Sequence, residues 1–304
     1  MAFLFFLICL VNKFMNEQKL LSSMRIFSVD DFVAGRLPRR ENFQPSIDIF
    51  EQECVLPYLG TDVYGTLLYG SANRDDFTVA SDVDYLMVVF TEGMYECVHH
   101  ATARALQDRN VLISTRVITL DDAQDGIHGV DKDFLGHLFP NCMQYGWKGQ
   151  NPLEILADDG LTLEQATRLT VTRYSKRLVI GYTSPTGSEA EYLDFLKSIL
   201  EKPWHTMRAA LQYRKITLKR DSKHELIQRY RTEVSDSRLV EDILSIQRVG
   251  KRYIGHLRRR QEEEQEPRYW RRVHEEMLRE IEALYPTALH FIDGNKRMMK
   301  PKQA

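Results

Sequence analysis

The sequence predicts an α+β protein whose strands lie in the first half of the chain and whose second half is helical. Two apolar runs, one ending at Gly70 and one spanning Tyr85–Phe90, have the length and composition of strands, and the β-branched run Val111–Leu120 predicts a third. Beyond residue 150 the apolar residues recur at helical spacing. We therefore expect two domains, over residues 25–150 and 151–304, which a chain of 304 residues can accommodate.

Two helices are expected to accompany the strands of the first domain. Ser46–Leu59 carries apolar residues at helical spacing and predicts an amphipathic helix that leads into the first strand. Met94–Asp108 predicts a second helix, which leads into the third strand. Asp121–Gln150 is rich in glycine and aspartate, so we expect a loop with short helical pieces there. Asn151 and Pro152 mark the expected boundary between the domains.

The second domain is expected to consist of about five helices, judged from the spacing of its apolar residues. Thr162 and Gln165 form a capping-box pattern, which predicts a helix from this point to Ile180. Further helices are expected over Glu189–Leu200, over Trp204–Arg220, after a cap at Ser235 or Asp236, and over Pro267–Leu284. We expect the basic tail after Asp293 to be frayed.

Two aspartates stand at the start of the second apolar run. Side chains alternate between the two faces of a strand, so Asp82 and Asp84 are expected to point to the same side. Two neighbouring carboxylates repel each other, and a divalent cation removes that repulsion. Hard oxygen ligands suit Mg²⁺, which takes one or two carboxylates and lets substrate phosphates complete its shell. We therefore expect Asp82 and Asp84 to bind Mg²⁺.

The turn that precedes this pair has the properties of a phosphate-binding turn. Gly70 has no Cβ, so the backbone there can approach a ligand closely. Ser71 adds a hydroxyl and an N–H that can hold a phosphate. Such a turn beside a paired-aspartate metal site is what phosphoryl or nucleotidyl transfer requires. The alternative is a surface hairpin that happens to carry acids, although an Asp-x-Asp pair inside an apolar strand is costly without a partner.

Gly70-Ser71, ten further residues and then Asp82-x-Asp84 resemble the signature of the DNA polymerase β-type nucleotidyltransferase superfamily. The segment that ends in Ser81-Asp82-Val83-Asp84 is similar to that of the minimal nucleotidyltransferases and the aminoglycoside adenylyltransferases. The resemblance covers about residues 45–125. It implies a small mixed β-sheet flanked by helices, an NTP bound with Mg²⁺ or Mn²⁺, and transfer of a nucleoside monophosphate to a hydroxyl acceptor with release of pyrophosphate.

The resemblance also implies roles for particular residues. Asp82 and Asp84 would be the catalytic and metal-binding carboxylates, and Gly70, Ser71 and Ser81 would hold the nucleotide. In similar nucleotidyltransferases a cation of the helical domain closes over the triphosphate. The candidates here share one predicted helix and are Arg168, Arg173, Lys176 and Arg177. We take Lys176 as the one that binds the nucleotide. The acceptor would be a small hydroxylated molecule, a protein side chain or an RNA end.

A third carboxylate, which the family carries on the strand beside Asp-x-Asp, is missing from the run Val111–Leu120. Ser114 or Arg116 would take its place, depending on register, and Arg116 would then bring a cation to the nucleotide. One explanation is a misjudged register, with Asp121 or Asp122 serving instead. The other is a weakened enzyme or a nucleotide-binding relative that no longer reacts. A toxin–antitoxin-type interaction protein is a further alternative.

Composition and the N-terminal residues limit the partners and the cellular compartment that we expect for the protein. The net charge of −2 argues neither for nor against nucleic acid as a partner. The four cysteines, Cys9, Cys54, Cys97 and Cys142, are far apart in the sequence, so we expect free thiols in a reducing, cytoplasmic compartment. The apolar run Met1–Val11 is too short to span a bilayer and lacks the flanks of a secretory signal, so no membrane partner is expected. A native start at Met15 or Met24, with residues 1–24 as an extension, is the favoured expectation.

Overall fold

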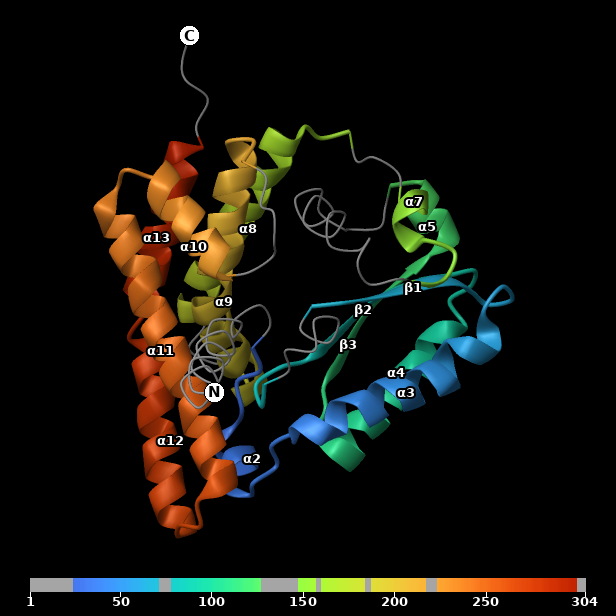
Figure 1. The fold of residues 1–304 in the computed structure, drawn as a ribbon, viewed down its shortest axis with the longest axis horizontal. Helices are drawn as coiled ribbons and strands as arrows, with labels where there is room; N and C mark the ends of the chain where they lie inside the picture. The colour runs from blue at the N-terminus through green and yellow to red at the C-terminus, as the bar shows by residue number, and fades with distance from the viewer. Residues whose placement is uncertain are drawn as a thin grey trace, which may run out of the picture. The chain divides into compact units, whose positions relative to one another are not determined.

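The computed structural model describes residues 24–70, 78–126, 147–156, 160–183, 187–216 and 223–299. Contacts between these residues divide the chain into two compact units. One unit spans Asp30–Thr170 and contains the β-sheet, and we call it the sheet unit. The other, the helical unit, combines the segment that precedes Asp30 with the chain from Val171 onward. The expected α+β class is thereby confirmed (Figure 1), whereas the expected leader lies, apart from Met24, outside the described residues.

Four strands form one mixed sheet in the order β3-β2-β1-β4. The strands are β1 (Val63–Tyr69), β2 (Val83–Val89), β3 (Ile113–Thr119) and β4 (Lys148–Gly149). β1 pairs antiparallel with β2 and with β4, whereas β2 and β3 run parallel. The three strands expected from the sequence are therefore present, and β2 lies between the other two.

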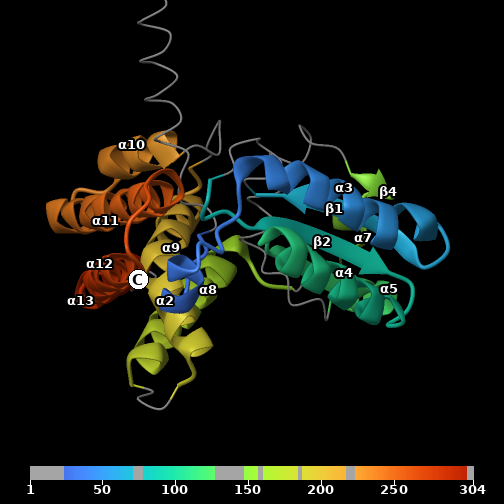
Figure 2. The ribbon, with the colours of Figure 1, turned by 90° about the horizontal axis from the view of Figure 1, so that it is seen from below.

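Helices cover both faces of β2, which explains why its sequence is a continuous apolar run. Val83, Tyr85, Met87 and Val89 pack against α3 (Phe43–Cys54) and α4 (Met94–Arg109). On the opposite face Leu86 and Val88 pack with residues of α5 (Leu120–Gln124) and α7 (Pro152–Ile155). Figures 1 and 2 show α3 and α4 side by side along the sheet. The long helices α3 and α4 thus cover one face of the sheet. The two short helices α5 and α7 and the candidate site lie on the other face.

The helices of the sheet unit end where local chemistry stops them. α3 ends at Cys54, earlier than expected, because Pro57 directs the following residues into a 3-10 turn over Leu56–Tyr58. α4 ends at Arg109, because the next residue, Asn110, adopts the left-handed conformation with φ 58°. Shorter pieces before them are α2 (Val29–Val33) and a 3-10 turn over Arg40–Asn42.

The expected loop over residues 121–150 contains a strand that the sequence did not predict. β4 adds to the edge of β1 by pairing Gly149 with Gly65. A Cβ at Gly65 would lie 1.9 Å from the backbone oxygen of Gln150, so only glycine admits this approach. The next helix, α7, is capped by the Asn151 side chain, which accepts a hydrogen bond from the N–H of Leu153. Residues 127–146 of the expected loop lie outside the described residues.

The helical unit is built from long helices packed side by side (Figure 1). They are α8 (Leu163–Thr183), α9 (Glu189–Tyr213), α10 (Lys223–Glu233), α11 (Ser237–Glu262), α12 (Pro267–Glu282) and α13 (Tyr285–Met298). The division between the units falls at Thr170, inside α8. Both predicted caps are confirmed, because Thr162 and Gln165 exchange hydrogen bonds of 2.8 and 3.2 Å and Asp236 accepts from the N–H of Arg238.

Three expectations for this unit were wrong. α9 is one helix that continues through Pro203, which is buried together with Trp204. α10 was not predicted at all, since its sequence is dominated by charged residues. The described part of the tail after Asp293 is not frayed but continues α13 to Met298, where the fully buried Asn295 accepts a hydrogen bond of 2.9 Å from the hydroxyl of Tyr230, and residues 300–304 lie outside the described residues. In each case burial against neighbouring helices outweighed the local sequence signal.

A segment at the start of the described chain is tied into the helical unit by polar groups. The N–H of Phe27 donates to the hydroxyl of Tyr253 at 2.9 Å, and the Nε2–H of His274 donates to the carbonyl of Phe27 at 3.0 Å. The second nitrogen of His274 lies 3.1 Å from Nε2 of His256, and the two rings stack. Since His274 is fully buried, this chain of hydrogen bonds is part of the core.

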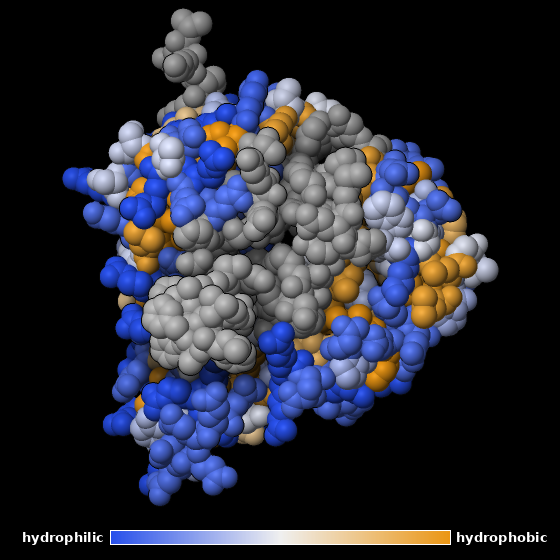
Figure 3. Space-filling model, viewed as in Figure 1, coloured by the Kyte–Doolittle hydropathy of each residue, from blue (hydrophilic) through white to orange (hydrophobic). Residues whose placement is uncertain are grey.

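The end of the helical unit around the turn between α11 and α12 has a hydrophilic surface. Hydrophilic side chains dominate the face around the turn between α11 and α12 in Figure 3, and the residues near that turn, such as Arg258, Arg259 and Glu262, are exposed. Among the helices that the structure describes, none is long and apolar enough to cross a bilayer.

Candidate functional site

The turn after β1 lies directly against the aspartate of β2. Tyr69 of β1 is paired with Asp84 of β2, and Gly70 follows with φ +76°. A Cβ built on Gly70 would lie 2.5 Å from Oδ2 of Asp84. Glycine is therefore required at position 70 for two reasons. The backbone is left-handed there, and the Asp84 carboxylate occupies the space that a side chain would need. The expected phosphate-binding turn and the expected metal ligand are in contact.

Asp82 precedes β2 and is held by a tight turn. The N–H of Thr78 donates to the Ser81 hydroxyl at 2.9 Å, and the N–H of Ser81 donates to the carbonyl of Thr78 at 3.0 Å. The N–H of Val83 then bonds to the carbonyl of Leu112 at 2.9 Å, which anchors the start of β2. Asp82 is only 2% exposed in this position. The Ser81 side chain, expected to contact the nucleotide, thus also shapes the turn that places Asp82.

Tyr69 joins the two aspartates in one electrostatic environment, and sequence reasoning missed it. Burial, followed by the negative charge of Asp84, raises the pKa of Tyr69, while Arg116 opposes the rise and Asp82 adds to it. Its hydroxyl, like that of an ordinary tyrosine at neutral pH, is protonated and available as a donor, and the raised pKa extends this state to higher pH. The signal that could have revealed it is its position immediately before Gly70, on the strand end that borders the Asp-x-Asp pair.

The register of β3 shows which residues occupy the position at which a third acid was expected. Ser114 pairs with Asp84, and Arg116 pairs with Leu86. Residues two apart share a strand face, so both Ser114 and Arg116 lie on the face of Asp84. Ser114 is the direct lateral neighbour, and neither residue is an acid. Asp122 belongs to α5, where its N–H bonds to the Thr119 side chain as part of the helix cap.

The donors present fit a magnesium ion that is completed by its substrate. Within the described ranges, no group of three or more His, Cys, Asp or Glu side chains is arranged to hold a metal. The two aspartates next to the Gly70 turn are hard oxygen donors, one of them shielded from solvent. Mg²⁺ needs no more than one or two carboxylates when phosphates fill the rest of its shell. The arrangement suits a metal–nucleotide complex better than a bare ion.

Two other residues expected at the site lie outside the part of the sheet unit that the structure describes. Ser71 lies outside the described residues. Lys176 is exposed on α8 and belongs to the helical unit, whereas the aspartates belong to the sheet unit. The role expected for each of them stays a prediction.

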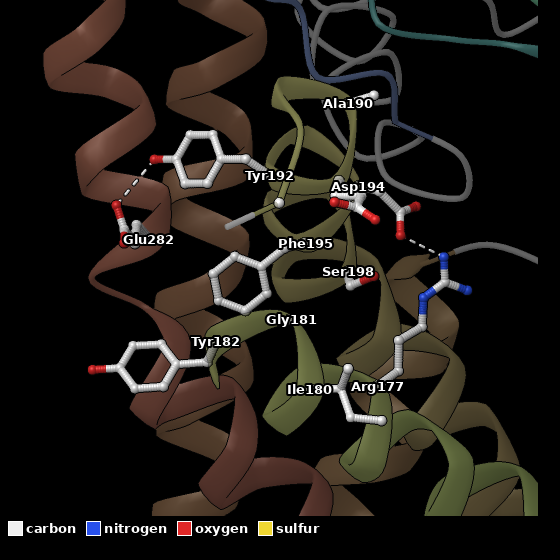
Figure 4. Close-up of a pocket in the computed structure, with 12 residues that line it drawn as sticks. Arg177, Ile180, Gly181, Tyr182, Ala190, Tyr192, Asp194, Phe195, Ser198 and Glu282 are labelled. Carbon is white, nitrogen blue, oxygen red and sulfur yellow. Dashed lines mark hydrogen bonds and ion pairs between the residues drawn. The ribbon is translucent and has the colours of Figure 1, made fainter. Parts of the chain in front are cut away.

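A pocket that no sequence motif indicated lies within the helical unit (Figure 4). It encloses about 720 Å³ between α8, α9 and α12. Tyr182, Tyr192 and Phe195 contribute aromatic rings to its wall, and Tyr192 donates a hydrogen bond of 3.0 Å to Glu282. The Arg177–Asp194 ion pair, 2.5 Å long, forms another part of the wall. Its distinctive chemistry is aromatic, and it shares no residue with the aspartate pair.

Comparison with known proteins adds no functional assignment to this geometry. Neither a scan against models of protein families nor a search of curated proteins finds a match for the chain.

Proposed function

We propose that the chain is a metal-dependent nucleotidyltransferase, which moves a nucleoside monophosphate from an NTP to a hydroxyl acceptor and releases pyrophosphate. One observation carries the proposal: the left-handed Gly70 turn is in contact with the Asp84 carboxylate, which follows the buried Asp82 by two residues. A glycine with positive φ is also common in plain hairpin turns, but here the turn lies against a carboxylate, which places an oxygen ligand next to backbone that can receive phosphates.

The residues of the sheet unit have distinct tasks in this proposal. Asp82 and Asp84 hold Mg²⁺ or Mn²⁺, and the metal supplies charge neutralisation on the phosphates when bound. Gly70 and Ser71 receive the phosphates on backbone N–H groups and a hydroxyl. Tyr69, which shares the electrostatic environment of both aspartates, is a hydroxyl donor at the edge of the site.

The two neighbours on β3 favour a slow reaction over a fast one. Ser114 stands beside Asp84 and cannot take a proton from the acceptor hydroxyl, a task for which a positioned base contributes about 10²–10⁴-fold. Arg116 instead adds a cation on the same face, which favours nucleotide binding. We therefore infer that binding is retained while transfer is slow. The acceptor remains one of three classes, a small hydroxylated molecule, a protein side chain or an RNA end, in a cytoplasmic setting.

The proposal is tested by incubating the protein with each of the four labelled NTPs and Mg²⁺ or Mn²⁺. Pyrophosphate release and a labelled product, with candidate acceptors and with the protein itself, are the expected results. Asp84→Asn should abolish both signals in a protein that is still folded. Absence of both metal-dependent NTP binding and pyrophosphate release in the unmodified protein would rule the proposal out.

A second candidate function is nucleotide sensing without transfer. Ser114 favours it, because the strand that should provide a base provides a hydroxyl beside Asp84. The same experiment separates the two, since a sensor binds the metal–nucleotide complex and releases no pyrophosphate with any acceptor.

A further inference from the structure

Two cysteines that are 43 residues apart in the sequence meet in the core of the sheet unit. Cys54 is the last residue of α3, and Cys97 lies in the first turns of α4. Their sulfur atoms are 3.1 Å apart. The thiol of Cys54 also points to the carbonyl of Cys97 at 3.3 Å. A disulfide bond is about 2.05 Å long, so an approach of roughly 1 Å would join them.

The two thiols differ in their access to solvent. Cys54 is fully buried, whereas Cys97 is partly exposed. Both are free thiols in the structure. A small polar oxidant therefore reaches Cys97 first, and Cys54 is the thiol waiting beside it. This combination of an accessible cysteine with an adjacent partner is what a reversible redox site requires.

We propose that Cys54 and Cys97 form a peroxide-sensitive thiol pair, in which Cys97 is oxidised first and Cys54 closes a disulfide between α3 and α4. This inference is independent of the nucleotidyltransferase proposal. Burial raises the pKa of the Cys54 thiol, and the neighbouring Cys97 raises it further, which keeps Cys54 protonated and leaves the first attack to Cys97.

The chemistry balances with hydrogen peroxide as the oxidant. The Cys97 thiolate attacks one peroxide oxygen, the O–O bond breaks, and a sulfenic acid forms while the departing hydroxide becomes water. The Cys54 sulfur then attacks the Cys97 sulfur. An S–S bond forms, the S–O bond breaks, and the leaving hydroxide takes the Cys54 proton as a second water. Two thiols and one peroxide give one disulfide and two waters, and a thiol reductant reverses the step.

The crosslink would enclose the part of the chain that carries the candidate site. Gly70, Asp82 and Asp84 all lie between Cys54 and Cys97 in the sequence, yet both cysteines pack on the sheet face opposite Asp84. Closing this loop restricts the unfolded chain, so oxidation should raise the thermal unfolding midpoint by several degrees. The face of Asp84 should be unaffected.

The experiment uses the full chain with Cys9 and Cys142 replaced by serine, so that only this pair can react. The reduced protein is treated with increasing hydrogen peroxide, the remaining thiols are alkylated, and peptides are mapped by mass spectrometry. A crosslinked peptide pair containing Cys54 and Cys97, lighter by two hydrogens and released by dithiothreitol, is expected. Adding Cys97→Ser should leave Cys54 alkylatable after denaturation at every dose.

Two results would overturn the inference. One is recovery of both cysteines in alkylated form at peroxide doses that oxidise the partly exposed Met298. The other is accumulation of Cys97 sulfinic acid without any crosslink. If the serine variants do not fold, the peptide map of the unmodified chain decides the question by the same peptide pair.

Discussion

Gly70 and Asp84 form the contact on which the proposed site depends. Gly70→Ala should disturb it in two ways, because alanine disfavours φ +76° by about 1–2 kcal/mol and its Cβ would fall 2.5 Å from the Asp84 carboxylate. We expect a loss of stability together with an affinity for the Mg²⁺–NTP complex at least about tenfold lower, as misplacement of one ligand implies. Urea unfolding and calorimetric titration measure the two effects.

Gly60 offers a matched control for this substitution. It has φ +81°, close to that of Gly70, but a Cβ there meets nothing within 4 Å. Gly60→Ala should therefore show the backbone cost alone, about 1 kcal/mol, and unchanged nucleotide affinity. Equal nucleotide affinities for the two alanine variants would show that the Gly70–Asp84 contact has no part in binding.

At the scale of single residues, the sequence predicts a functional role only where the residue and its neighbours in the chain form a recognisable motif. Gly70, Asp82 and Asp84 are recognisable because they lie close together in one motif. Tyr69 acquires its environment from β2 and from Arg116 on β3, and no local pattern contains these contacts. The same holds for Cys54 and Cys97, whose meeting depends on the packing of α3 against α4.

At the scale of elements, the parallel pairing of β2 with β3 makes a prediction about catalysis. Strands are about 4.8 Å apart, so an aspartate at position 114 would place its carboxylate next to Asp84. Ser114→Asp should raise the rate of nucleotidyl transfer by at least about tenfold, since a positioned base contributes about 10²–10⁴-fold. It should also lower stability when Mg²⁺ is removed, because three carboxylates then repel one another.

Arg116→Asp is the matched comparison on the same strand face. Position 116 pairs with Leu86, one repeat further from the aspartates, so an acid there should not raise the rate. It should weaken NTP binding instead, because a cation is lost. A faster reaction with Arg116→Asp and none with Ser114→Asp would contradict the assignment of Ser114 to the vacant acid position.

Elements were predictable where the deciding interactions are local. The capping box of Thr162 and Gln165 and the cap at Asp236 are formed by residues at most three positions apart. β4 was missed because its two residues become a strand only by pairing with the edge of β1. Two helices separated near Pro203 were expected where α9 is one helix, because proline disfavours a helix interior. Burial of Pro203 and Trp204 in the core of the helical unit outweighs this preference.

On the scale of the whole molecule, the stability of the helical unit should depend on pH. The helical unit contains the stacked pair of His274, which is fully buried, and His256, which is partly buried. Burial lowers the pKa of each to about 4, against about 6.5 in an unfolded chain. Between these values the unfolded state binds more protons, so stability is full above about pH 6.5 and falls as the pH drops toward 4.

Urea unfolding at a series of pH values measures this loss. Each titrating histidine contributes up to about 1.4 kcal/mol per pH unit within the window. His256→Gln should reduce the slope by about half, as one group is removed. His99→Gln, which replaces an exposed histidine of α4, should leave it unchanged. A pH-independent stability between pH 6.5 and 4 would show that the pair does not titrate as its burial implies.

The central claim is that Asp82 and Asp84 bind a metal–nucleotide complex, and calorimetric titration of NTP with Mg²⁺ or with EDTA tests it most directly. Asp108→Asn, on the exposed surface of α4, is the matched control for Asp82→Asn and Asp84→Asn. The account predicts Mg²⁺-dependent binding by the unmodified protein and by Asp108→Asn, reduced at least about tenfold in either site variant, with the folded state retained in all. Equal binding by all four proteins, or binding that does not depend on Mg²⁺, would contradict it.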